Sequence, residues 1–337
     1  MYRLEPRTHL EPRRTRRRRA VLAGIAAALL AASTSQGAEP TVVAHAAGKG
    51  LYPENTIPAI DSSFDIGSDW VEIDIRRTSD GVPVLMHDAT VDRTTDGTGL
   101  ISALSLVQVQ ALDAGSWFAP EYAGTPVPTL EQALQEALGR GPALLDMKDP
   151  LIGAVVATAL ANVGASPSDI RFWASTSAEV TEANTHVPGA PVFYQMLSGD
   201  ETSVQNILAF GVDGISIRWE ILSPTMIQTG HSGGVPVFVW GTTNVQNMAT
   251  ALAWGVDGIH ASFPDRPIDL ISTPDCMDGA DNDLDGLTDH PADPDCTAPE
   301  DTSEAVKVPA LGTIATAISA SLLLALAALR LSRRPAV

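Results

Sequence analysis

Cysteine and basic residues are both scarce in this chain of 337 residues, and each shortage removes a class of function. The only two cysteines, Cys276 and Cys296, are too few for a metal site built entirely from thiolates. Of the 21 lysines and arginines, eight lie in residues 1–19 and four follow residue 306, while 38 of the 40 acidic residues lie between. The middle section therefore carries a formal charge of about −29, which excludes nucleic-acid binding as its main function.

The first 38 residues have the layout of an export signal. Four arginines, Arg16 to Arg19, precede an alanine- and leucine-rich run that continues to Ala32, and small residues follow at Gly37 and Ala38. The apolar run is too short to cross a bilayer comfortably. We therefore expect residues 1–38 to direct export, with general and twin-arginine secretion both left open.

The last 32 residues, 306–337, have the layout of a membrane anchor. The stretch from Ala310 to Leu329 contains no charge and is long enough to cross a bilayer as a helix. The arginines after it indicate that the tail faces the cytoplasm and everything before it faces outward. This layout resembles the C-terminal sorting signals of some bacterial exported proteins. We expect a membrane-bound protein whose main domain lies in the periplasm or at the cell surface.

The section from 39 to 271 alternates short apolar runs with alanine- and leucine-rich helical segments. Eight such units in one domain predict a TIM (β/α)8 barrel, although periodicity alone leaves an open doubly wound sheet as an alternative. Residues 89–125, rich in Asp, Thr and Gly, read as an insertion after the third strand. The predicted strands are Val42–Ala46, Trp70–Ile75, Val82–His87, Ala143–Met147, Ile170–Ala174, Val192–Met196, Gly214–Trp219 and Val235–Trp240.

Two histidines stand at the ends of predicted strands. His45 follows the first strand and His87 ends the third. The carboxyl ends of barrel strands carry the active sites of TIM barrels, and histidine suits acid or base work near neutral pH. Each alone could also be a hydrogen-bonded structural residue.

Carboxylates gather on neighbouring predicted strands. Glu72 and Asp74 are two residues apart, so both project to the same face of a strand. Asp146 is a further carboxylate on another predicted strand, and Lys148, two residues later, projects to the same face as Asp146. Like charges placed together are costly unless a cation lies between them, and a hard divalent ion prefers oxygen ligands. The pattern predicts a metal site.

An ordered set of motifs resembles the glycerophosphodiester phosphodiesterase family and covers about residues 42–270. The set includes Pro53-Glu54-Asn55-Thr56, Glu72-Ile73-Asp74, His87-Asp88, Asp92-Arg93-Thr94-Thr95 and Gly255-Val256-Asp257-Gly258-Ile259. The resemblance implies a TIM barrel that hydrolyses a small or lipid-derived glycerophosphodiester to glycerol 3-phosphate and an alcohol. Attack by water and attack by the substrate's own hydroxyl both remain open.

The same resemblance implies roles for individual residues. It assigns a divalent cation, Mg²⁺ or Ca²⁺, to Glu72, Asp74 and Asp146, and proton transfer to His45 and His87. On the substrate side it places Glu54 and Trp240, with Glu54 supporting the pocket rather than binding the metal. Lys148 and Lys49 are the positive residues of this chain that remain as candidates for substrate contact.

The chain departs from the family pattern at three places. Ala46 stands where an arginine usually contacts phosphate, Asp146 replaces a glutamate, and Ala261-Ser262 replaces Thr-Asp. Related sphingomyelinase D enzymes have the same barrel and aspartate at the second of these places, so we expect metal binding to survive. A phospholipase D-like lyase of the sphingomyelinase D kind is one alternative function. A catalytically impaired barrel that only binds phosphodiesters is another.

Residues 272–305 form a separate acidic module. Asp281, Asp283, Asp285 and Asp289, with Gly286 among them, resemble a calcium loop, and Cys276 and Cys296 frame it. In an exported chain such an isolated pair is expected to form a disulfide. The module is predicted to be a calcium-binding, disulfide-closed stalk, with a solvated acidic linker as the alternative.

Overall fold

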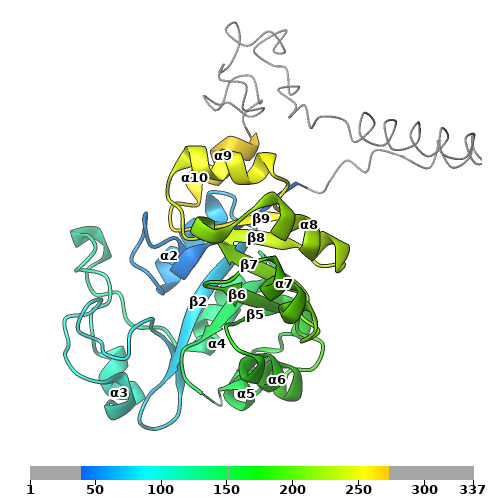
Figure 1. Ribbon diagram of the computed structural model, residues 1–337. Helices are drawn as coiled ribbons and strands as arrows, with labels where there is room; N and C mark the ends of the chain where they lie inside the picture. Colours follow the sequence, from blue (N-terminus) through cyan, green and yellow to red (C-terminus); the bar gives the residue numbers. More distant parts are fainter. Residues whose placement is uncertain (1–38, 151, 273–337) are drawn as a thin grey trace, which may run out of the picture. The chain divides into compact units, whose positions relative to one another are not determined.

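The computed structural model describes residues 39–150 and 152–272, and within them eight parallel strands close into a barrel (Figure 1). Each strand pairs in parallel with its neighbours, and β1 closes the ring by pairing with both β9 and β2. The barrel strands are β1 (Thr41–Ala44), β2 (Trp70–Arg77), β4 (Ala143–Met147), β5 (Ile170–Ala174), β6 (Val192–Met196), β7 (Gly214–Arg218), β8 (Val237–Trp240) and β9 (Gly258–Ala261).

Helices cover the outside of the ring (Figure 1). Local side chains fix where these helices begin. At the start of α4, the Thr129 hydroxyl accepts a hydrogen bond from the Gln132 amide, and the Gln132 side chain accepts one from the Thr129 amide. The main core lies between the helices and the outward faces of the strands. The covering helices are α2 (Ile57–Asp65), α4 (Leu130–Ala137), α5 (Gly153–Val163), α6 (Ser177–His186), α7 (Glu201–Leu208), α8 (Pro224–Ser232), α9 (Val245–Ala253) and α10 (Asp265–Ser272).

The inside of the barrel is divided between apolar and polar side chains. The apolar part is a plug of buried side chains, with Trp70 and Trp240 packed against it: Val43, Leu144, Trp173, Phe193 and Phe238. Asp146 lies near the carboxyl end of β4, and Glu72 and Asp74 lie along β2. Because side chains alternate along a strand, the same strands that fill the plug also place polar groups at the mouth.

The prediction that residues 82–87 form the third strand of the barrel is wrong. The centre of this segment forms β3 (Pro83–Leu85), which runs antiparallel to the end of β2, so that Ile75 faces Leu85. The eighth barrel strand is instead β9, which the sequence reading did not assign. A short apolar run looks the same whether it pairs in parallel or antiparallel, which is why the count of eight agreed although one member differed.

The predicted insertion therefore follows a hairpin rather than a barrel strand. It contains the short helix α3 (Leu106–Gln110) and lies to one side of the barrel in Figure 1. It has a small core of its own, formed with residues that flank it: Val84, Met86, Val91, Ile101, Val109, Ala114 and Val127.

Several predictions lie outside the described residues. These are the export signal, the acidic module beyond Ser272 with its calcium loop and disulfide, and the membrane span at 306–337. Among residues 39–150 and 152–272, no helix has the length and apolar character needed to cross a membrane.

Candidate active site

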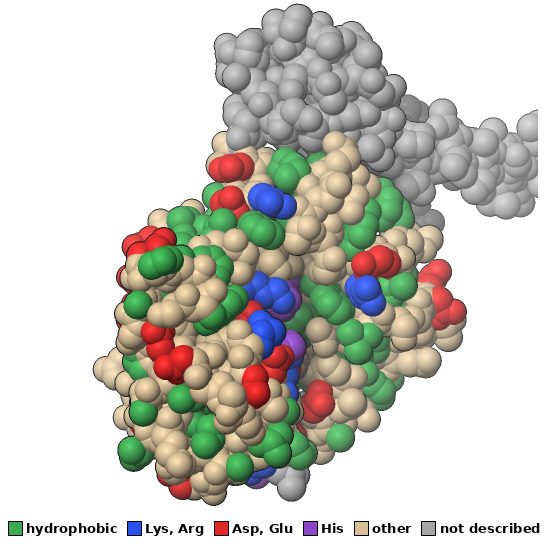
Figure 2. All heavy atoms as spheres, turned by 90° about the vertical axis from the view of Figure 1, so that its left-hand side faces the viewer, with side chains coloured by type: hydrophobic (Ala, Val, Ile, Leu, Met, Phe, Trp, Pro, Cys, Tyr) green, Lys and Arg blue, Asp and Glu red, His purple; other side chains and the backbone are tan. Residues whose placement is uncertain are grey.

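Three carboxylates converge at the mouth of the barrel. The strand register pairs Asp74 of β2 directly with Asp146 of β4, and Glu72 lies two residues before Asp74 on the same face. Glu72, Asp74 and Asp146 can each place one oxygen within 4.8 Å of the others. The space-filling view shows histidine, basic and acidic side chains gathered in a furrow on this side (Figure 2). The predicted metal ligands therefore do come together.

Two residues hold this cluster in place. The Lys148 ammonium lies 2.6 Å from Asp146 Oδ2 and 3.0 Å from Asp74 Oδ1. Asn55, in the left-handed conformation at φ 60°, donates from Nδ2 to Asp74 Oδ2 at 2.7 Å and accepts the Asp74 amide at 2.9 Å. Asparagine tolerates this backbone region better than most residues.

The electrostatics of the cluster favour a bound cation. Burial, with Asp74 and Asp146 nearby, raises the pKa of Glu72 well above its usual range. Burial also raises the pKa of Asp146, to about 6. Burial acts to raise the pKa of Asp74 as well, but Lys148, His87 and Asn55 outweigh it, and the pKa of Asp74 is lowered. Within the described residues Glu72 Oε1 is buried and has no hydrogen-bond partner. Three hard oxygen donors with an unsatisfied oxygen fit a divalent ion such as Mg²⁺ or Ca²⁺.

His45 is positioned by a strained turn after β1. Ala46 and Ala47 have positive φ values of 46° and 57°, and this turn aims the Ala46 amide at Glu72 Oε2, 2.5 Å away. His45 Nδ1 lies 3.3 Å from Ser262 Oγ, and its Nε2 lies 4.0 Å from Glu72 Oε2. Burial, followed by His260 and Lys49, lowers the pKa of His45 well below its usual value. The ring is therefore neutral near pH 7.

His87 reaches the mouth because the antiparallel β3 returns the chain toward it. Its Nδ1 lies 2.7 Å from Asp88 Oδ1, and Asp88 Oδ2 accepts from Arg93 Nε at 2.6 Å. Both remaining nitrogens of Arg93 bond to Glu54, at 2.9 and 2.7 Å. Glu54, which the sequence analysis placed on the substrate side, is thus committed to Arg93 and supports His87 from behind.

This chain of contacts makes Asp88 a positioning residue for His87. Replacing Asp88 with asparagine should lower kcat by roughly 10–10²-fold with little change in KM, because the ring loses its oriented partner while substrate contacts remain. Steady-state kinetics would check this, and the matched change Asp92→Asn, in the same loop but away from His87, should have little effect. A change confined to KM would contradict the positioning role.

Lys49 and Trp240 remain candidates for substrate contact. The Lys49 charge lies close enough to lower the pKa of both His45 and His260. Trp240 is half-buried and packs edge-on against Trp173 at 5.9 Å. Ala46, where an arginine was expected from the resemblance, is only 1% exposed. An arginine at this position would therefore have to displace its neighbours.

His260 is the residue that the sequence reading missed. It lies on β9, and its ring centre is 4.3 Å from that of Trp173 and 4.7 Å from that of His45. Its Nε2 lies 3.6 Å from Glu72 Oε2. Recognising Gly258–Ala261 as the eighth strand would have placed this side chain inside the barrel.

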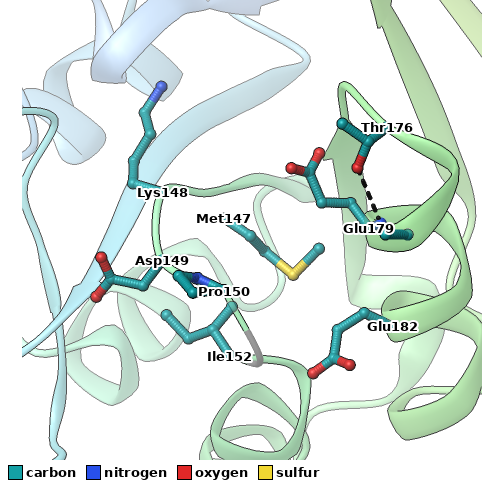
Figure 3. A pocket seen from close by; sticks show the side chains of 9 residues that line it. Met147, Lys148, Asp149, Pro150, Ile152, Thr176, Glu179 and Glu182 are labelled. Carbon is teal, nitrogen blue, oxygen red and sulfur yellow. Dashed lines mark hydrogen bonds between the residues drawn. The ribbon is translucent and has the colours of Figure 1, made fainter.

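A separate pocket of about 300 Å³ lies beside the end of β4 (Figure 3). Met147 points into it, whereas the Lys148 ammonium points away from it toward the carboxylates. Neighbouring residues on a strand face opposite sides, so this pocket lies on the outer side of the barrel wall. It is therefore distinct from the carboxylate cluster. Its other lining residues include Asp149, Ile152, Thr176, Glu179 and Glu182.

The carboxylate cluster is expected to cost stability when no metal is present. A raised folded-state pKa means that Asp146 stabilises the fold only below its ordinary pKa, and this contribution is lost as the pH rises through about 6. In EDTA at pH 7.5, Asp146→Asn should therefore be more stable than the wild type by up to about 3 kcal/mol. Urea unfolding at pH 4 and 7.5 would measure this, and the gain should vanish at pH 4.

The fold and the site together define a class: a TIM-barrel hydrolase with paired histidines and a cluster of carboxylates at the barrel mouth. Residues 45–266 match the profile of the Glycerophosphoryl diester phosphodiesterase family. The match covers well over half of the chain, and the chain belongs to this family. It is a phosphoric diester hydrolase, as the sequence resemblance implied.

Individual proteins agree with this assignment. The chain is 31% identical over 233 residues to YhdW of Bacillus subtilis, to which glycerophosphodiester phosphodiesterase activity is ascribed; the match covers 66% of this chain and 95% of that protein. The crystal structure of a glycerophosphodiester phosphodiesterase from Agrobacterium tumefaciens aligns with a TM-score of 0.61 at 26% identity, covering 68% of this chain and 98% of that one. An Oleispira antarctica phosphodiesterase, solved with the product sn-glycerol-3-phosphate, shares the fold with a TM-score of 0.63 at 24% identity, covering 69% and 97%.

Proposed function

We propose that this protein hydrolyses glycerophosphodiesters to glycerol 3-phosphate and an alcohol, and that it needs a divalent cation to do so. The observation that carries the proposal is the convergence of Glu72, Asp74 and Asp146 beside His45. The names of the A. tumefaciens and B. subtilis relatives support the substrate class.

The residues of the site divide the work between charge and proton transfer. A Mg²⁺ or Ca²⁺ held by Glu72, Asp74 and Asp146 would stabilise negative charge on the phosphate oxygens. Lys148, fixed between two carboxylates, and Lys49, near His45, supply positive charge from the protein itself. These two lysines supply part of the positive charge that an arginine at position 46 would offer to the phosphate and that the methyl group of Ala46 cannot.

The two histidines are suited to opposite proton transfers. His45 is half-buried and lies beside Glu72 of the carboxylate cluster, so it is placed to accept the proton of the attacking hydroxyl. His87 is 42% exposed and is oriented by Asp88, so it donates a proton to the departing alkoxide. The attacking hydroxyl is that of water or of the glycerol moiety, and in the second case a cyclic phosphate forms first.

The placement of the enzyme in the cell is also part of the proposal. Residues 1–38 direct export, residues 272–305 form a calcium-binding stalk closed by Cys276 and Cys296, and residues 306–337 anchor the chain. The sequence patterns of these segments support this arrangement. Fractionation of cells that express the full chain tests it, because activity should remain with the membranes and be accessible to a protease added outside.

A substrate panel with product analysis tests the proposed reaction. Glycerophosphocholine, glycerophosphoethanolamine and a lysosphingolipid would be compared by kcat/KM, with phosphorus NMR of the products. Glycerol 3-phosphate as the final product supports the proposal. Preference for the sphingolipid with a lasting cyclic phosphate would instead indicate the lyase alternative, which the family membership does not favour. No turnover of any diester would indicate an impaired barrel.

A further inference from the structure

His260 is a buried histidine for which the proposed reaction has no use. Its side chain is 1% exposed, and among the described residues neither ring nitrogen has a hydrogen-bond partner. A buried polar group without a partner costs stability, and native proteins rarely leave one unexplained. Trp173 and His45 pack against the ring in T-shaped contacts, which hold it in place without giving its nitrogens a hydrogen-bond partner. This combination points to a ring that binds a ligand.

Three donor groups converge beside this ring. His260 Nε2 and His45 Nε2 lie 3.6 and 4.0 Å from Glu72 Oε2, and all three residues can place a donor atom within 4.8 Å of one another. A tetrahedral ion with bonds of about 2.1 Å separates its ligand atoms by about 3.4 Å. Shifts of about one ångström or less per side chain would therefore complete a three-ligand site.

The donor atoms are also in the right chemical state. His45 Nδ1 lies against the Ser262 hydroxyl, which leaves Nε2 free to bind, and ligating histidines usually have their second nitrogen occupied in this way. His260 Nε2 is buried without a hydrogen-bond partner among the described residues and faces Glu72 Oε2, so it is also free to bind.

We propose that His45, Glu72 and His260 form a second metal position, selective for an imidazole-preferring ion such as Zn²⁺, and that filling it inhibits the enzyme. Two imidazoles and one carboxylate suit Zn²⁺, whereas the three carboxylates suit Mg²⁺ or Ca²⁺. The inhibitory part rests on the proposed function, because a metal on His45 removes that ring from proton transfer.

The two positions share Glu72, and the charges around it oppose filling both at once. Glu72 is fully buried, and its Oε2 already accepts the Ala46 amide. The Lys49 charge, near both histidines, and the Lys148 charge, beside the carboxylates, would oppose two dications bound at once. Zn²⁺ therefore displaces the activating ion rather than joining it.

Direct metal binding tests the site independently of catalysis. The full wild-type chain and His260→Phe would be titrated with Zn²⁺ against a chromogenic chelator, with His231→Phe, an exposed histidine on α8, as the control. We expect His260→Phe to weaken one Zn²⁺ equivalent by roughly 100-fold or more, since losing even an outer partner of a ligand costs 10–100-fold. His231→Phe should match the wild type.

Cobalt gives a second readout that needs no variant. Co²⁺ in the wild-type chain should show the intense visible absorption of a four-coordinate site with nitrogen ligands. A weak spectrum typical of six oxygen ligands would overturn the proposal. So would unchanged Zn²⁺ affinity in a folded His260→Phe, or loss of the Zn²⁺ equivalent in Asp146→Asn instead.

Inhibition is measured separately. The ratio of rates with and without Zn²⁺, at fixed Mg²⁺ or Ca²⁺, cancels any change in the basal rate of a variant. The Zn²⁺ concentration for half inhibition should rise at least about 10-fold in His260→Phe. Loss of Zn²⁺ binding with unchanged inhibition would refute the inhibitory role alone. A chain that binds Zn²⁺ as predicted but hydrolyses no diester would refute the proposed function and leave the metal position standing.

Discussion

Alanine at His45 or at His87 is expected to lower kcat by roughly 10²–10⁴-fold, the usual contribution of a positioned acid or base. The physical reason is their placement on the two sides of the carboxylate cluster. His45 is half-buried beside the fully buried Glu72, and His87 is held by Asp88 at 2.7 Å. Neither ring belongs to the apolar plug that fills the barrel. The fold should therefore survive both changes.

Kinetics with a matched control would check this expectation. His231, paired with Asp257 on the outside of the barrel, offers a histidine whose replacement should leave turnover unchanged. Thermal unfolding of each variant separates lost chemistry from lost structure. Near-normal turnover in a folded His45→Ala or His87→Ala would remove that residue from the mechanism.

Asparagine at Asp74 is expected to abolish tight binding of Mg²⁺ or Ca²⁺ and to lower kcat by roughly 10³-fold or more. The metal contributes several kcal/mol to transition-state stabilisation, and each 1.36 kcal/mol is tenfold in rate. Asparagine keeps the shape of Asp74 but removes the charge that Lys148 and Asn55 hold in its ionised form. Affinity should fall because charge, not shape, holds a hard ion.

Calorimetric titration of Asp74→Asn with both ions gives the direct comparison. Asp61→Asn, an exposed carboxylate on α2 that pairs with Arg140, is a suitable control. Unchanged affinity in Asp74→Asn would mean that the ion binds elsewhere in the chain. Restored turnover at high metal concentration would instead confirm that only affinity was lost.

Much of this site could be predicted from the sequence because strand periodicity is strict. Glu72 and Asp74, two residues apart on a strand, must share a face, and the structure places both with Asp146 at one cluster. Family membership, suggested by the ordered motifs, was confirmed. What periodicity cannot give is pairing direction, and β3 was therefore mistaken for a barrel strand.

The remaining features depend on contacts between distant segments. The double hydrogen bond between Arg93 and Glu54 joins residues that are 39 positions apart in the sequence, and only the folded insertion brings them together. His260 was missed because β9 has four residues and begins with glycine, which weakens any strand signal. The left-handed turn at Ala46 and Ala47 was also beyond prediction, since alanine is not typical of that conformation.

The central claim is that a cation held by the three carboxylates makes this barrel a phosphodiesterase. Phosphorus NMR of glycerophosphocholine incubated with the full chain tests it most directly, in Mg²⁺ or Ca²⁺, then in excess EDTA, then after the ion is restored. The account predicts glycerol 3-phosphate with the ion, no product in EDTA while the circular dichroism of the fold persists, and recovery on restoration. Hydrolysis at the same rate in EDTA, by a protein shown to be metal-free, would contradict it.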